Sequence, residues 1–144
     1  MTLKVSTALR NAMLSGTGLK TAIALGKIMI YAGPVPADAD AAVTGTLLCT
    51  VTLNSTATGL SLGTAASGIL PKAVEVWSGV NVATGTATYF RYVAVGDTGA
   101  LSTTQARLQG TCGTASADLN MSSVNLTSGA TQTIDAANIT LPTF

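Results

Sequence analysis

The sequence contains no histidine, and only 9% of its 144 residues are charged, against about 25% in ordinary soluble domains. The missing imidazole excludes Ser-His-Asp and Cys-His catalysis and removes the commonest metal ligand. Seven basic and six acidic residues leave a net charge of +1, so electrostatic repulsion between copies is weak. Such a surface is either solvated by Ser, Thr and Asn or covered by partner subunits, and we expect the second.

Aromatic residues make up only 4% of the chain, and there are two cysteines, Cys49 and Cys112. A core made largely of small side chains suits closely packed sheets. The cysteines lack CxxC spacing and have no further sulfur or imidazole partner, which argues against a zinc site. We expect two small apolar core residues, and the sequence leaves open whether they pair.

Long apolar runs, basic clusters and phosphate-binding glycine motifs are also missing. The apolar run 21–33 is interrupted by Lys27 and is too short to cross a bilayer. Lysines and arginines are dispersed among acids, so no basic stripe for nucleic acid forms. The carboxylates are scattered singly except Asp38 and Asp40, whose loop lacks the other oxygen ligands of a calcium site. We predict no catalytic, cofactor-binding or metal-binding residue, and neither nucleic acid nor membrane as a partner.

Residues 5–15, VSTALRNAMLS, have the apolar spacing of a helix. The residues on its apolar face are Val5, Leu9, Ala12 and Met13. Ser6 can cap its start and Gly16 can end it. The glycines of GTG at 16–18 separate this helix from the next segment, which predicts an N-terminal helix or arm over residues 1–20 and a β-rich domain over 21–144. LKTAIALG at 19–26 fits a short helix as well as a strand.

The rest of the chain consists of short runs rich in β-branched and aromatic residues, bounded by Gly, Pro and Asp. We expect strands at 27–33, 44–53, 59–63, 73–82, 87–95, 104–112, 118–121, 122–127 and 131–141. Only ATGT separates the runs 73–82 and 87–95, which predicts a hairpin. Many short strands without alternating helices indicate a mainly β fold, an antiparallel β-sandwich or barrel-like domain with a short N-terminal helix.

Arg91 lies in ATYFRYVAV, a run that otherwise indicates a buried strand. An unpaired buried guanidinium is strongly destabilising, so Arg91 must be paired or exposed. Glu75 on the neighbouring hairpin strand and Asp97 in the following turn are candidate partners. The guanidinium can also lie flat against Tyr89 or Trp77. We predict an ion pair that fixes strand register or a subunit contact.

The aromatic side chains could instead form a sugar-stacking surface, as in a glycan-binding adhesin that uses Trp77 and the hairpin tyrosines. Alternation along the strand places Tyr89 with Arg91 on one face, and Phe90 with Tyr92 on the other. Because the aromatic residues are split between two faces, we expect them to pack in the core.

Three stretches together resemble a known family: GKIMIYAGPVPADADAAVTGTLLCTVTL (26–53), GTATYFRYVAVGDTGALSTTQARLQGT (85–111) and LTSGATQTIDAANITLP (126–142). They are similar to small structural proteins in the virions of tailed bacteriophages and prophages. The likeness extends from LRNAML in the predicted helix to ITLP near the end of the chain, and brings no catalytic residue with it.

The resemblance implies a place in the phage particle, assembled in the cytosol of the bacterial host. We expect a non-enzymatic capsid decoration or cement protein that binds the major capsid protein and copies of itself. The segment 1–20, with Leu9 and Met13, is the candidate attachment arm. A neck, collar or tail component that forms a ring at one vertex is the alternative.

Overall fold

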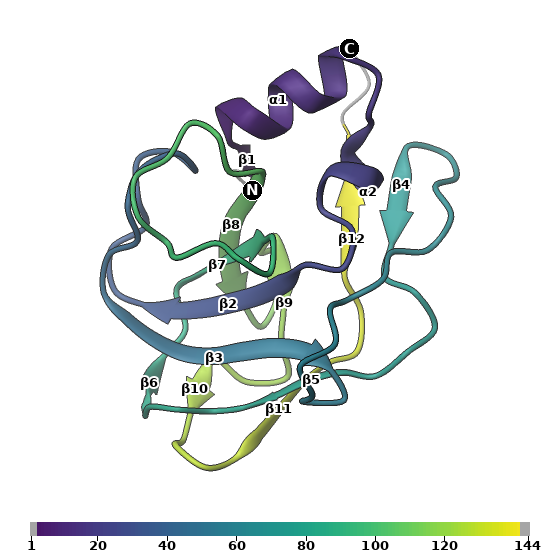
Figure 1. Ribbon diagram of the computed structural model, residues 1–144. Coiled ribbons are helices and arrows are strands. Elements are labelled where there is room, and N and C mark those ends of the chain that lie inside the picture. Colours follow the sequence, from purple (N-terminus) through teal and green to yellow (C-terminus); the bar gives the residue numbers. More distant parts are fainter. Residues whose placement is uncertain (1–2, 142–144) are drawn as a thin grey trace.

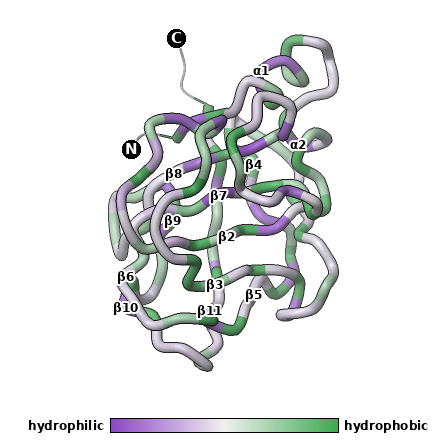
Figure 2. The backbone as a smooth tube through the Cα atoms, turned by 60° about the vertical axis from the view of Figure 1, so that its left-hand side comes forward, coloured by the Kyte–Doolittle hydropathy of each residue, from purple (hydrophilic) through white to green (hydrophobic). Residues whose placement is uncertain are grey.

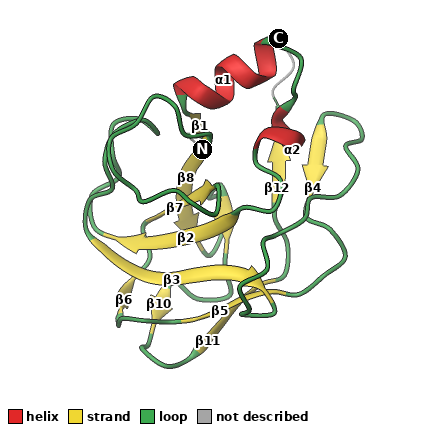
Figure 3. Cartoon of the chain, in the orientation of Figure 1, coloured by secondary structure: helices red, strands yellow, loops and turns green. Residues whose placement is uncertain are grey.

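A computed structural model describes residues 3–141, in which two short helices precede a β-rich region (Figures 1 and 3). The helices are α1 (Thr7–Leu14) and α2 (Leu19–Ala22). The strands are β1 (Lys4–Val5), β2 (Lys27–Ala32), β3 (Thr46–Leu53), β4 (Ile69–Pro71), β5 (Trp77–Val80), β6 (Gly85–Thr86), β7 (Tyr89–Val93), β8 (Arg107–Gly113), β9 (Leu119–Asn120), β10 (Asn125–Leu126), β11 (Thr131–Ile134) and β12 (Asn138–Thr140).

One large sheet and two small sheets account for these strands. The large sheet has the order β1-β8-β7-β2-β3-β5-β11, and β9 pairs with β8. The small sheets are β10-β6 and β12-β4. All pairs are antiparallel except β8 with β9. With 39% strand and 9% helix, the protein is mainly β and sandwich-like, as the sequence predicts.

The large sheet is strongly curled around the core. Trp77 on β5 and Tyr92 on β7 are three strand positions apart, because β2 and β3 lie between them. In a flat sheet that separation would be about 14 Å. Their ring centroids are only 6.2 Å apart, in an edge-to-face arrangement. The concave side of the sheet therefore encloses the core, which includes Leu9, Ile30 and Leu108.

A bulge in β3 determines which of its residues are buried. Ile30 of β2 lies opposite Cys49, and the next residue, Tyr31, lies opposite Leu47, so Leu48 has no partner. The extra residue allows the neighbours Leu48 and Cys49 both to be buried, whereas strict alternation would expose one of them.

The N-terminal segment is joined to the β-rich region through three described features. β1 pairs with β8, with Lys4 opposite Gln109. Ser6 caps α1, since its Oγ accepts the Leu9 N–H at 3.2 Å, and the same Oγ accepts the Arg107 N–H at 2.9 Å. The Leu9 side chain is fully buried, and Met13 packs against the core. The predicted helix is confirmed, although it begins at residue 7 because residues 4–5 enter the sheet.

Strands β5 and β7 do not form the predicted hairpin. β5 pairs with β3 and β11, whereas β7 pairs with β2 and β8. The segment between them forms β6, which pairs with β10. The prediction was wrong because four linking residues do not specify a tight turn, and more distant strands are the actual partners. The ambiguous stretch 19–26 begins with α2, and the expected strand 59–63 makes only isolated bridges.

Candidate functional site

The convex face of the central strands buries polar side chains beneath two loops. Alternation along β7 places Phe90 and Tyr92 in the concave core, as predicted, so that Tyr89 and Arg91 lie on the opposite face. The loops 33–45 and 94–106 cover that face, because their backbone and side-chain atoms accept hydrogen bonds from it. We call this the buried polar face; its strand residues are Tyr31, Tyr89, Arg91, Arg107 and Gln109, and loop 94–106 adds Asp97.

The strongest interaction of the buried polar face joins Arg107 to Asp97. Nε of Arg107 donates to Oδ2 of Asp97 at 2.5 Å, and Nη2 donates to Oδ1 at 2.8 Å. Burial by itself raises the pKa of Asp97, but the hydrogen bonds from Arg107 and from the Gly99 N–H outweigh it, so the pKa lies below its ordinary value. The carboxylate therefore stays ionised at neutral pH.

Arg91 is buried, and no carboxylate of residues 3–141 is hydrogen-bonded to it. Its Nε donates to Oε1 of Gln109 at 2.8 Å and its Nη2 donates to the Asp38 carbonyl at 3.2 Å. Nη1 has no hydrogen-bond partner within residues 3–141. Burial, followed by the nearby charge of Arg107, lowers the pKa of Arg91. The predicted ion pairs are wrong: Asp97 binds Arg107, and Glu75 lies elsewhere.

Glu75 is hydrogen-bonded to the indole of Trp77. Its Oε1 accepts the Trp77 Nε1–H at 2.7 Å and the Ser61 N–H at 2.7 Å. The Lys72 ammonium lies 5.4 Å from the Trp77 ring centroid, within range of a cation–π contact. Glu75 and Trp77 are thus brought together on β5 and the turn before it, away from Arg91.

Tyr89 is buried and is held by contacts within the protein. Its ring stacks on Tyr31 with 5.0 Å between centroids, and its hydroxyl donates to the Thr44 carbonyl at 2.6 Å. All five aromatic residues within the described range 3–141 are at most 5% exposed. These five aromatic residues therefore offer no exposed ring face on which a sugar could stack, as a glycan-binding adhesin would require.

Sequence reasoning missed Arg107 and Gln109 as partners in this face. Their spacing of two residues in ARLQG was the available signal, because alternation places them on one side of a strand. Pairing of β8 with β7 then sets Gln109 opposite Arg91. The partner strand is distant in sequence, so only the fold reveals the contact.

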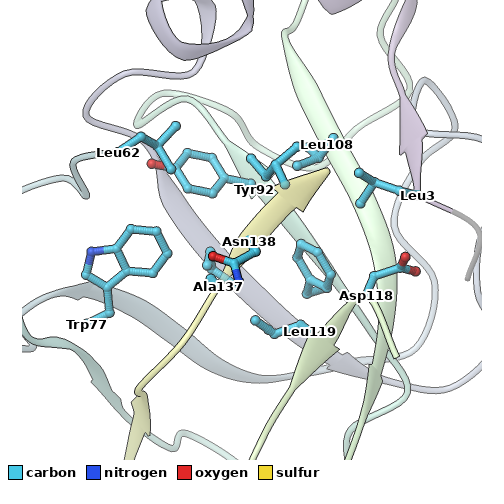
Figure 4. Close-up of a pocket in the computed structure, with 12 residues that line it drawn as sticks. Leu3, Leu62, Trp77, Tyr92, Leu108, Asp118, Leu119, Ala137 and Asn138 are labelled. Carbon is cyan, nitrogen blue, oxygen red and sulfur yellow. The ribbon is translucent and has the colours of Figure 1, made fainter. Parts of the chain in front are cut away.

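A small cavity lies on the concave side, beneath the C-terminal segment (Figure 4). Trp77, Tyr92 and Leu108 line it, and strand β12, which carries Asn138, passes across it. Its volume is about 30 Å³, enough for about one or two water molecules. An adjoining groove of about 260 Å³ shares Leu3 and Ala137 with it. Both are smaller than the roughly 300 Å³ at which ligand pockets begin.

Two kinds of group among the described residues bear on catalysis, metal ligands and thiols. Residues 3–141 contain no group of three or more Cys, Asp or Glu side chains that could hold a metal ion. Burial raises the pKa of the Cys49 thiol to about 11, and burial with the charge of Asp118 raises that of Cys112 to about 12. Both cysteines are free thiols that stay protonated at neutral pH, so neither is an activated nucleophile.

The outer surface combines sparse charge with exposed apolar side chains. Figure 2 shows hydrophilic residues scattered in short stretches along the backbone. The most exposed large apolar residues are Leu14 (87%), Val74 (108%) and Leu101 (75%). Single exposed apolar residues of this kind are ordinary on a protein surface.

Comparisons of the chain with protein-family models, with curated proteins and with solved structures found no match. Within the part of the chain that the structure describes, no helix is long and apolar enough to cross a membrane. The resemblance to phage virion proteins therefore stays a prediction.

Proposed function

We propose that this chain is a non-enzymatic structural protein of a bacteriophage virion, and that it decorates the head lattice as a cement protein. The phage assignment rests on the sequence resemblance, and the structural observation that supports an assembling protein is the contrast between the interior and the surface. The polar groups suited to binding or proton transfer, Arg91, Asp97 and Arg107, are buried and hold loops in place. The outside carries few charges, so electrostatic repulsion opposes association with other proteins only weakly.

The outer face of α1 is the proposed contact with the capsid. Arg10 and Leu14 are exposed on this helix, while Leu9 anchors it to the core. Deleting residues 1–20 would therefore also remove a core side chain, so surface substitutions give a cleaner test. We expect Leu14→Asp to lower the amount of protein bound to particles while leaving thermal stability unchanged. Val74→Asp, at another exposed apolar residue, is the matched control, and equal particle binding of the wild type and Leu14→Asp would contradict this contact.

The function is tested by counting copies of the protein in purified particles. Quantitative mass spectrometry against the major capsid protein, on virions of the phage or induced prophage that encodes the chain, gives the ratio. A ratio near parity, or a simple fraction of it, supports a place on the head lattice. A ratio of a few per cent overturns the cement role in favour of a neck or tail ring. Absence from the particle overturns both.

A further inference from the structure

Strand β11 is the last strand of the large sheet, and one of its edges has no partner strand among residues 3–141. Gly129, with φ +84°, donates its N–H to the Asn81 carbonyl, and the Asn81 N–H donates to the Ala130 carbonyl. This arrangement is a bulge that starts the ladder with β5. Gln132 lies opposite Gly79. Ladder alternation then directs the peptide groups of Gln132 toward β5 and those of the residues on either side of it outward.

The outward peptide groups belong to Thr131 and Thr133. Within residues 3–141 no strand pairs with this edge. The Thr133 carbonyl accepts the Gln132 Nε2–H at 2.9 Å, which uses one of its two lone pairs. The edge can therefore still exchange backbone hydrogen bonds with another strand.

This edge lacks the residues that usually prevent pairing. Edge strands of monomeric proteins are commonly protected by lysine, proline or a covering element. β11 (TQTI) and β5 (WSGV) contain neither charge nor proline. Their exposed side chains are Val80, Thr131 and Thr133. By contrast, Lys4 lies in β1 at the opposite edge, and β4 ends in Pro71.

We propose that β11 pairs antiparallel with β11 of a second copy, about a two-fold axis through Gln132. Thr131 then lies opposite Thr133 of the second copy, and the two exchange both backbone hydrogen bonds. Thr–Thr pairs across strands are favourable. Asp135 lies opposite Gly129 of the second copy, so no like charges meet. A second copy is the occupant because the strand is complementary to itself in this register.

The pairing deepens the proposed role as an assembling virion protein and rests on it for its biological setting. It makes a specific prediction about charge. Because position 131 meets position 133 of the other copy, Thr131→Lys/Thr133→Glu places opposite charges together twice. Thr131→Lys/Thr133→Lys places like charges together twice. Both side chains are exposed, so both variants should fold.

Sedimentation velocity over a concentration series gives the dimer dissociation constant for each purified protein. We expect the wild type and the Lys/Glu variant to dimerise, and the Lys/Lys variant to dissociate about tenfold more readily or worse. Asn138→Lys/Thr140→Lys, at exposed positions of β12, is the matched control and should dimerise like the wild type. Thermal melts verify that each variant is folded.

A wild type that remains monomeric at every concentration overturns the pairing, and so does a dimer that responds equally to both charge patterns. These outcomes are distinct from failure of the proposed function. A monomer found in virions would overturn the pairing alone, whereas a β11-paired dimer that is absent from virions would overturn the virion role alone.

Discussion

Arg107 donates two parallel hydrogen bonds to the carboxylate of Asp97, and both side chains are 1% exposed. The same guanidinium donates to the carbonyls of Ala39 and Ala100, at 3.3 and 2.7 Å. These two carbonyls belong to the two loops that cover the buried polar face. One side chain on β8 therefore fixes both loops.

Asp97→Asn should destabilise the protein by about 3–5 kcal/mol, because it leaves the Arg107 guanidinium buried without a counter-charge. Urea unfolding monitored by circular dichroism measures the change. Asp38→Asn is the matched control, since Asp38 is exposed and its Oδ1 accepts only the Ala41 N–H among the described contacts. It should cost less than about 1 kcal/mol. Equal losses for the two variants would contradict the role assigned to the ion pair.

The same ion pair makes the protein sensitive to acid. The pKa of Asp97 is lowered in the folded protein, so its contribution is fully present above the unfolded pKa of about 3.9 and is lost as pH falls through the lower folded pKa. The wild type should therefore lose more unfolding free energy than Asp97→Asn between about pH 5 and pH 2. Parallel curves for the two proteins would show that Asp97 does not titrate with folding.

Arg91 and Arg107 should respond differently to the same substitution. Arg107→Met leaves the buried Asp97 carboxylate without its cation, so it should lower the free energy of unfolding by about 3–5 kcal/mol. Arg91→Met breaks no ion pair and leaves mainly the Gln109 Oε1 atom without a donor, so it should cost about 1–2 kcal/mol. Chemical denaturation of the two variants side by side decides the order. A larger loss for Arg91→Met would contradict the greater importance assigned to the Arg107–Asp97 ion pair.

Leu9 lies on the buried face of α1, and Leu14 lies on its exposed face. Leu9→Ala should cost about 2–5 kcal/mol, because Leu9 is 0% exposed and leaves a cavity in the core. Leu14→Ala should change stability by less than about 0.5 kcal/mol, since Leu14 is 87% exposed. Thermal unfolding of both variants measures the difference. Similar melting temperatures would mean that α1 detaches from the core in solution.

Local patterns in the sequence predicted several of the helices and strands but not which strands pair. The capped helix, β2 and β3 follow from apolar spacing, and alternation correctly divided Phe90 from Arg91. The partners of Arg91 were missed because Gln109 is eighteen residues away and meets it only through strand pairing. Pairing depends on the packing of whole strand faces, which no short run of residues specifies.

The pairing of β1 with β8 also constrains how the chain folds. Lys4 has its partner at Gln109, so the first strand of the sheet cannot dock until more than a hundred further residues have been synthesised. Bringing strands so distant in sequence together has a high entropic cost, so we expect this protein to fold slowly. Until then the apolar face of α1, with Leu9 at its centre, has no core to cover it. We therefore expect the unfinished chain to aggregate more readily than the completed protein.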